Sequence, residues 1–148
     1  MLEKKILIID DDPDLLLGLT PRLKANGYSV VTAPDAASAM AMARRELPDL
    51  IILDLRLPAV RDGLVLPRKI SRTAELTKTP VIVLSSANAA QFEKRVLDAG
   101  AIGFFQKPPV NDELLAAIRQ AMVQVTDRSS GAPSSSVLPM IQTTKVSN

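Results

Sequence analysis

The 148-residue sequence contains neither cysteine nor histidine. Without cysteine, disulfides, thiolate metal sites and thiol nucleophiles are excluded. Without histidine, His-based catalytic triads and imidazole metal ligands are excluded as well. The chain also cannot act as the histidine-bearing partner of a phosphorelay. Its chemistry must therefore depend on other side chains.

Aromatic residues, net charge and long apolar runs are also scarce. Aromatic residues make up 3% and hydrophobic residues 47%, so we expect a folded domain with an aliphatic core. The net charge is +2, with basic residues spread along the chain, which argues against direct nucleic-acid binding by this domain. No apolar run reaches the roughly 18–20 residues that span a bilayer. The first residues do not resemble a signal peptide, so we expect a cytoplasmic protein without membrane contact.

The most informative stretch is an apolar run that ends in a single carboxylate. Ile51, Ile52 and Leu53 precede Asp54, and Pro58 prevents further strand. Such a run, bounded by turn signals, is typical of a strand buried on both faces. In an open α/β sheet, ligands bind at the carboxyl ends of strands, where Asp54 would lie.

Strand-like and helix-like segments alternate five times along the chain. Strands are expected over 6–9, 28–33, 49–54, 81–84 and 101–105, and helices over 13–25, 35–47, 64–72, 88–99 and 110–125. Pro21 is expected to kink or shorten the first helix. The alternation predicts a doubly wound α/β domain with a five-stranded parallel sheet and helices on both faces. We expect this domain to occupy residues 1–126, followed by a Ser/Pro-rich flexible tail or linker over 127–148.

Polar residues follow the strands at one predicted edge of the sheet. Asp10, Asp11 and Asp54 would converge there and repel one another unless a cation is present. Carboxylates with open coordination positions suit Mg²⁺. Ser85 and Lys107 reach the same edge from the fourth and fifth strands. Together these groups suit phosphoryl transfer to an aspartate.

Over roughly residues 4–125 the chain resembles the receiver domain of two-component response regulators, such as chemotaxis regulators. The family has an acidic pair after the first strand, a phospho-accepting Asp after the third, Thr or Ser after the fourth, and Lys-Pro after the fifth. In this sequence these positions hold Asp10 and Asp11, Asp54, Ser85, and Lys107-Pro108. The resemblance implies a flavodoxin-like three-layer sandwich with strand order 2-1-3-4-5.

The resemblance also implies roles for individual residues. Asp54 would accept a phosphoryl group from a sensor histidine kinase or phosphotransfer protein. Asp11 and Asp54 would bind Mg²⁺ directly, Asp10 mainly through water, and Arg56 through its backbone carbonyl. These assignments define an aspartyl-phosphate site with a magnesium cofactor.

The remaining implied roles concern switching. Ser85 would move towards the phosphate, Lys107 would pair with it, and Phe104 would be the switch aromatic. The Lys107–Pro108 bond is expected to be cis. Arg56 and Ala87 occupy the positions that tune dephosphorylation, and Ala87 offers no polar group to orient water, so we predict slow phosphate loss.

The expected output is a changed protein-interaction surface, not enzymatic turnover beyond self-phosphorylation. The surface would bind a downstream protein or a missing effector domain, with homodimerisation left open. One alternative is a pseudo-receiver that binds partners without being phosphorylated. Two other interpretations are disfavoured. A haloacid-dehalogenase-type hydrolase needs a second acid where this sequence has Arg56. A flavodoxin-like cofactor binder needs a Gly- or Ser/Thr-rich phosphate loop after the first strand, which this sequence lacks.

Overall fold

The computed structural model describes residues 3–56, 64–85, 89–109 and 111–129, and for 89–92 and 124–129 it describes the backbone only. The loop expected over residues 58–63 and the tail from residue 130 lie outside the described residues.

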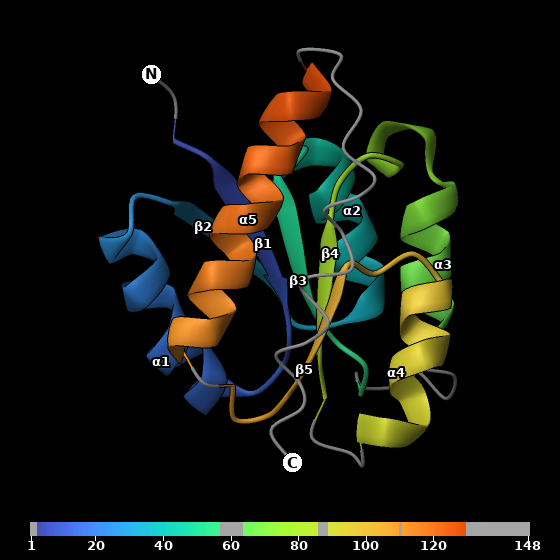
Figure 1. Ribbon diagram of the computed structural model, residues 1–148, viewed down its shortest axis with the longest axis horizontal. Helices are drawn as coiled ribbons and strands as arrows, with labels where there is room; N and C mark the ends of the chain where they lie inside the picture. Colours follow the sequence, from blue (N-terminus) through green and yellow to red (C-terminus); the bar gives the residue numbers. More distant parts are fainter. Residues whose placement is uncertain (1–2, 57–63, 86–88, 110, 130–148) are drawn as a thin grey trace.

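Five parallel strands form one sheet in the order β2-β1-β3-β4-β5, which confirms the expected topology (Figure 1). The strands are β1 (Lys5–Ile9), β2 (Ser29–Ala33), β3 (Leu50–Asp54), β4 (Val81–Ser85) and β5 (Gly103–Gln106). Every residue of β3 and β4 is buried, as expected for central strands covered on both faces.

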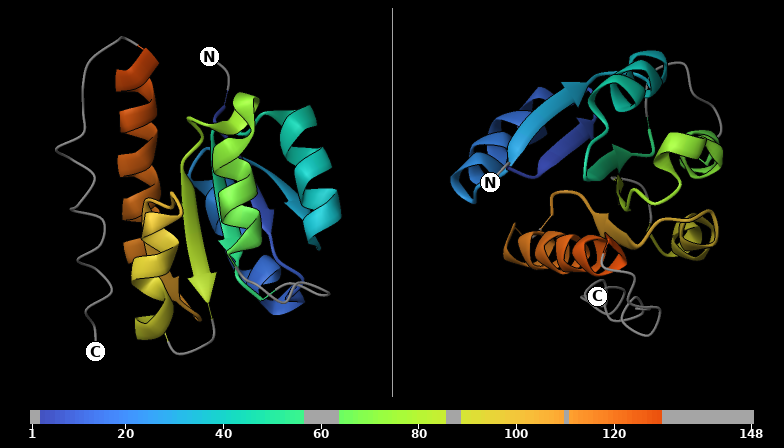
Figure 2. Two further views of the ribbon diagram at one scale, coloured as in Figure 1. Left: turned by 90° about the vertical axis from the view of Figure 1, so that its right-hand side faces the viewer. Right: turned by 90° about the horizontal axis from the view of Figure 1, so that it is seen from above.

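Helices cover both faces of this sheet and make it the middle of three layers (Figure 2). The helices are α1 (Pro13–Ala25), α2 (Ala36–Glu46), α3 (Val65–Arg72), α4 (Ala89–Asp98) and α5 (Asn111–Ser129), with a short 3₁₀ helix η1 (Ala74–Leu76) that the sequence pattern did not predict. α1 and α5 pack on one face, and α2, α3 and α4 pack on the other. α5 ends four residues beyond its expected end at residue 125.

Two separate cores result from the alternation of side chains along the strands. On β3, Ile51 and Leu53 face α2, α3 and α4, whereas Leu50 and Ile52 face α1 and α5. Both cores are mainly aliphatic, in agreement with the composition. Burial on both faces holds β3 rigidly and so fixes the position of Asp54 at its end.

The start of α1 directly follows the acidic segment after β1. Asp12 is the N-cap, and its carboxylate accepts a hydrogen bond from the backbone N–H of Asp14 at 3.0 Å. Pro13 occupies the first turn, where a missing N–H costs nothing. This cap ends β1 and starts the helix within three residues, so Asp10 and Asp11 stay at the sheet edge.

Of the two effects expected of Pro21, a kink or a shortening, the helix α1 does not show the shortening. The helix runs through Pro21 to Ala25 and ends at Asn26 and Gly27, which has a positive φ of 92°. Pro21 deprives the carbonyl of Leu17 of its usual donor. Both residues are exposed, so water can solvate that carbonyl and the helix continues.

Within the described part of the chain, none of the helices combines the length and the apolar character that crossing a bilayer requires.

Candidate functional site

The strand register brings the predicted site residues to one edge of the sheet. Ile9 pairs with Leu53, so the next residues on these strands, Asp10 and Asp54, come level with each other. Ser85 pairs with Gln106 at the ends of β4 and β5, and Lys107 follows immediately. Parallel strand pairing therefore brings Asp10, Asp54, Ser85 and Lys107 to the same edge of the sheet.

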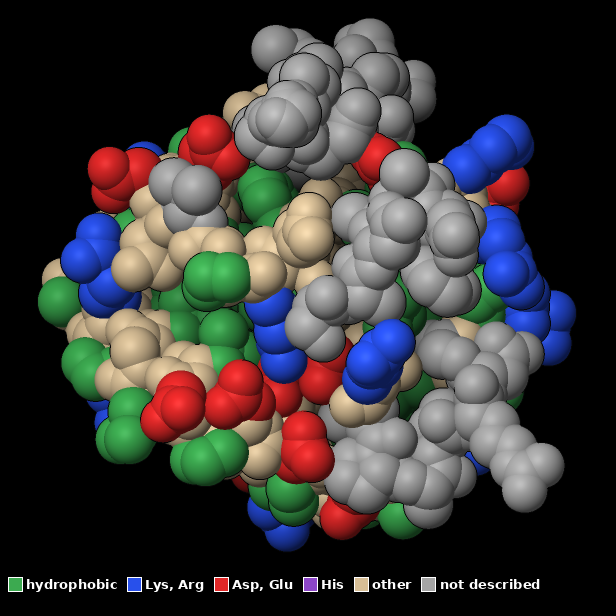
Figure 3. All heavy atoms as spheres, turned by 90° about the horizontal axis from the view of Figure 1, so that it is seen from below, with side chains coloured by type: hydrophobic (Ala, Val, Ile, Leu, Met, Phe, Trp, Pro, Cys, Tyr) green, Lys and Arg blue, Asp and Glu red, His purple; other side chains and the backbone are tan. Residues whose placement is uncertain are grey.

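Three carboxylates meet at this edge. Asp10, Asp11 and Asp54 each offer an oxygen within 4.8 Å of the oxygens of the other two. Asp10 and Asp54 are buried, whereas Asp11 is exposed. Figure 3 looks onto this edge and shows acidic side chains gathered near the middle of the face, with basic side chains beside them. The cluster is thus open to solvent on the side of Asp11.

Lys107 supplies a cation to two of these carboxylates. Its Nζ lies 2.8 Å from Oδ2 of Asp10 and 3.4 Å from Oδ2 of Asp54. The backbone N–H of Lys107 donates to the carbonyl of Ser85 at 2.8 Å, which ties the lysine to the end of β4. The Lys107–Pro108 bond is cis, as expected. The hydrogen bond to Ser85 therefore keeps the backbone of Lys107 next to the end of β4.

Backbone N–H groups orient the two buried carboxylates. Asp10 accepts a hydrogen bond through Oδ1 from the N–H of Asp12 at 2.9 Å. Asp54 accepts one through Oδ1 from the N–H of Arg56 at 3.1 Å. In each case the other oxygen, Oδ2, faces Lys107. Both Oδ2 atoms thus face the same ammonium.

The protonation equilibria of Asp54 and Lys107 reflect burial and the neighbouring charges. Burial is the largest influence on Asp54 and raises the pKa of its carboxyl group. The charge of Asp10 adds to this rise, and the N–H of Arg56 and the ammonium of Lys107 oppose it. Burial lowers the pKa of Lys107, but the two carboxylates outweigh it, so the pKa lies above its usual value. The site thus retains uncompensated negative charge.

The donor set of this site fits a hard divalent cation. Three carboxylates face one ammonium, which leaves a formal charge of −2 when all four groups are ionised. Oδ2 of Asp10 is buried, and its close polar contact is the ammonium of Lys107 at 2.8 Å. Clustered carboxylate oxygens with an open side are the ligands that Mg²⁺ and Ca²⁺ prefer. Asp10, Asp11 and Asp54 could therefore bind a metal ion.

The two predicted switch residues lie on β4 and β5. Ser85 is fully buried at the end of β4. Phe104 is also buried and packs in the core that faces α2, α3 and α4. Its ring therefore points inwards in this structure. Ala87 lies outside the described residues.

The structure adds a hollow beside the site that the sequence analysis did not identify. Its volume is about 450 Å³, and it lies between α1 and the segment from Lys107 to Asn111. Lys107 lines it together with Asp12, Leu15 and Pro108. Asp12 and Leu15 lie one helical turn apart, and this spacing was the signal in the sequence that could have indicated the hollow.

Comparison with known proteins supports this geometry. The family model of the response regulator receiver domain matches residues 6–119. The transcriptional regulatory protein KdpE of Mycobacterium tuberculosis is 40% identical over 117 residues, which cover 79% of this chain and 50% of KdpE. The DNA-binding dual master transcriptional regulator RpaA of Synechocystis is 37% identical over 124 residues, which cover 84% of this chain and 51% of RpaA. The chain thus spans about half the length of these relatives.

Solved structures agree with the family model. The non-phosphorylated HemR receiver domain of Leptospira biflexa is 30% identical, with a TM-score of 0.71, and the match covers 81% of this chain and 94% of that domain. The beryllofluoride-activated receiver domain of RstA from Klebsiella pneumoniae is 28% identical, with a TM-score of 0.72, covering 80% and 98%. The fold, the order of the acidic and basic positions and these similarities together show that the chain belongs to the receiver-domain family of two-component response regulators.

Proposed function

We propose that the chain is a phosphorylatable receiver that accepts a phosphoryl group on Asp54 and then changes a protein-interaction surface. The observation that carries this proposal is the convergence of Asp10, Asp11 and Asp54 within 4.8 Å, with Nζ of Lys107 at 2.8 Å from Asp10 and 3.4 Å from Asp54. A nucleophilic carboxylate and a fixed cation at one point are what phosphoryl transfer requires.

In the proposed reaction, Oδ2 of Asp54 attacks the phosphorus of a phosphohistidine on a sensor kinase or phosphotransfer protein. A P–O bond forms as the P–N bond breaks, and the histidine nitrogen leaves with its electron pair. The N–H of Arg56 holds Oδ1, so that Oδ2 is the free nucleophile. Lys107, which faces Oδ2, would stabilise the charge that develops on the phosphoryl oxygens.

A bound Mg²⁺ would neutralise the phosphate charge and orient its oxygens. Asp11 and Asp54 are the proposed direct ligands, with Asp10 acting mainly through water and Arg56 through its backbone carbonyl. The convergence of the three carboxylates within 4.8 Å supports this assignment.

The proposed response starts at Ser85 and Phe104. Movement of Ser85 towards the phosphate would let the ring of Phe104 reorient and alter the face formed by α4, β5 and α5. The output would pass to a downstream protein, an effector domain or a second copy of the chain. The relatives named above regulate transcription, so we propose that the output is also transcriptional regulation. We place the protein in the cytoplasm. The proposed receiver spans residues 1–126 and is joined to a tail or linker over 127–148.

A beryllofluoride titration tests the proposal directly. Beryllofluoride with Mg²⁺ should bind at Asp54 and shift the amide resonances of Ser85 and Phe104 in NMR spectra. The Asp54→Asn variant should show no such shift under the same conditions. An unchanged wild-type spectrum at saturating reagent would instead support the alternative of a pseudo-receiver that binds partners without phosphorylation.

A further inference from the structure

A second hollow, which shares no lining residue with the acidic cluster, lies between the first turns of α2 and α3. Its volume is about 290 Å³. Met40 and Leu66 are buried within it, and Val65 is 50% exposed beside it. The lining residues are apolar except for one lysine: Ala36, Ala37, Met40, Val65, Leu66 and Lys69. Small alanines on one side leave room for one inserted apolar side chain.

The two helices beside this hollow are strongly basic. By sequence α2 and α3 carry five basic residues and one acid, a net charge of +4. α1 and α5 together carry four basic and four acidic residues, and α4 carries two of each. The excess positive charge is therefore a local property of this helix pair and not of the chain, whose net charge is only +2.

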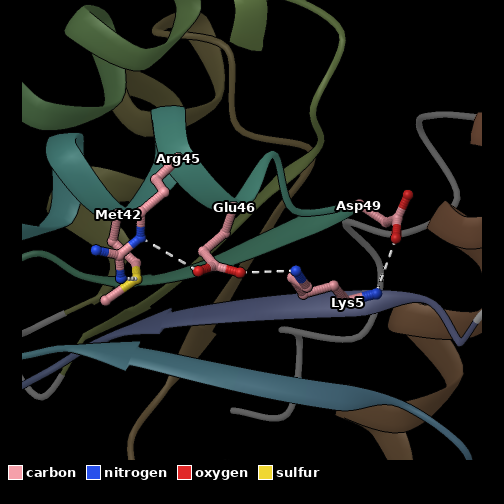
Figure 4. Close-up of polar contacts among 5 residues, drawn as sticks. All are labelled: Lys5, Met42, Arg45, Glu46 and Asp49. Carbon is pink, nitrogen blue, oxygen red and sulfur yellow. Dashed lines mark hydrogen bonds and ion pairs between the residues drawn. The ribbon is translucent and has the colours of Figure 1, made fainter.

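The one acid of α2 does not offset these cations. Glu46 points away from α3 towards β1, where its carboxylate lies 2.7 Å from Nζ of Lys5 (Figure 4). It also contacts Arg45 at 3.3 Å. Lys5 therefore already balances Glu46, and the charge next to α3 remains positive.

Three cations follow the hollow along both helices. Lys69 is part of its lining. Arg72 comes one turn after Lys69 on α3, and Arg44 comes one turn after Met40 on α2, so helical spacing places both on the sides of the helices that line the groove. Both arginines are exposed. In Figure 3 basic side chains also line the margin on the side where Figure 1 places α3 and α4.

We propose that the α2–α3 groove binds an acidic amphipathic helix of a partner protein. One apolar side chain of that helix fills the hollow, and carboxylates on its flanks pair with Arg44, Lys69 and Arg72. An apolar hollow edged by cations suits such a helix-in-groove contact. A second copy of the chain fits less well, because none of its described helices carries more than one net negative charge.

The observations also favour a protein over a nucleic acid. A nucleic-acid site combines phosphate-binding cations with aromatic or polar groups that contact bases. The hollow contains only aliphatic side chains and one lysine. The proposal is independent of phosphorylation at Asp54, so it can fail or succeed apart from the function proposed above.

A peptide-display selection tests the proposal with the full chain. The probe is a library of helical peptides of about 14 residues, roughly 20 Å long, with fixed leucines on one face and Glu, Lys, Gln or Ser at the remaining positions. The proposal expects enrichment of Glu beside the leucines. Enrichment of Lys, no charge preference, or no binder would overturn it.

Location is tested with the best enriched peptide. The amide resonances of Ala37, Met40 and Lys69 should shift on binding, whereas those of α5 should not. The Lys69→Glu/Arg72→Glu variant should bind at least about tenfold more weakly, because like charges then face each other. The control Arg22→Glu/Lys24→Glu on α1 makes the same change in net charge and should bind normally. Equal weakening by both variants, or shifts confined to other helices, would overturn the proposal.

Two further measurements complete the test. If the Lys69→Glu/Arg72→Glu variant does not fold, the resonance shifts of the wild-type chain still decide the location. Sedimentation of the chain alone, and titration with a DNA duplex, examine the other occupants. If the chain self-associates and Lys69→Glu/Arg72→Glu abolishes this, the groove binds a second copy of the chain instead. If the chain binds the duplex and the same variant abolishes this, the groove binds nucleic acid instead.

Discussion

The two ends of the sheet hold the same kinds of charged residue in different proportions. At the amino-terminal end, Lys5 meets two acids that each have a donor: its Nζ lies 2.7 Å from Glu46, and its backbone N–H donates to Asp49 at 2.8 Å (Figure 4). At the carboxyl-terminal end, three carboxylates cluster, and the one lysine there pairs with two of them, Asp10 and Asp54. Arg45 also lies 3.3 Å from Glu46, so two cations accompany two acids in the first cluster, whereas the second has three acids with one lysine and carries excess negative charge.

The difference appears in the pKa values of the acids. A hydrogen bond and the charge of Lys5 hold the pKa of Glu46 below its usual value. Burial and Asp10 hold the pKa of Asp54 above its usual value, despite Lys107. Excess buried negative charge is costly unless a cation compensates it. The two clusters therefore differ in how much each would gain from a bound cation.

Replacing the proposed acceptor should have the largest effect. Asp54→Ala should abolish labelling by acetyl phosphate, because it removes the proposed nucleophile, Oδ2 of Asp54. Intact-protein mass spectrometry measures the added phosphate. The matched control is Asp49→Ala, just before the other end of the same strand, which should still be labelled. Full labelling of Asp54→Ala would assign the acceptor to another residue.

Loss of the shared cation should come next. Lys107→Ala leaves Asp10 and Asp54 facing each other without a cation, and we expect a loss of about 2 kcal/mol, less than for a fully enclosed pair because the site opens to water. Urea unfolding measures this loss, and Mg²⁺ should restore part of it. The variant should still bind metal but no longer couple phosphorylation to the shift at Phe104. Normal coupling would contradict the role given to Lys107.

The pH dependence of Asp54 has the opposite sign from that of a salt-bridged acid. Because its pKa is higher in the folded state, protonated Asp54 favours folding. That contribution is complete below about pH 3.9 and is lost as the pH rises through the folded-state value. Asp54→Asn should therefore stabilise the metal-free protein at pH 7 by about 1 kcal/mol, allowing for solvent screening. Thermal melts with and without EDTA measure this, and equal or lower stability of the variant would contradict it.

The smallest effect is expected at the matched end. The lowered pKa of Glu46 means that its contribution is present above about pH 4.3 and is lost as the pH falls through the folded-state value. Glu46→Gln should reduce stability slightly at pH 7 and leave acetyl-phosphate labelling unchanged. Parallel urea titrations at pH 7 and pH 3.5 measure the difference. A larger loss than that of Lys107→Ala would remove the distinction between the two ends.

Local patterns in the sequence were sufficient for most of the fold. The apolar run before Asp54 predicted β3, and the helix expected over 13–25 has the same bounds as α1; both are confirmed. Pro21 does not shorten α1 as helix propensity suggests. The reason is that the carbonyl of Leu17, which loses its donor, lies in an exposed part of the helix where water can solvate it. The η1 turn was missed because its three residues, Ala74–Leu76, are too few to form a period.

The site was predicted in part. The order of Asp10, Asp11, Asp54, Ser85 and Lys107 along the chain indicated that they share one edge, since parallel strands end together. The sequence did not indicate that Lys107 lies closer to Asp10 than to Asp54, or that Phe104 points inwards. These features depend on side-chain distances across three strands, and no local pattern encodes them.

The sequence by itself determined the alternation of strands and helices, the aliphatic core and the residue types available for chemistry, because these follow from local periodicity and composition. Only the tertiary structure decided which charges are balanced. Glu46 meets Lys5 across 41 positions of the chain, and Asp54 competes with Asp10 for one ammonium. Charge balance depends on distances through space, and strand pairing sets those distances.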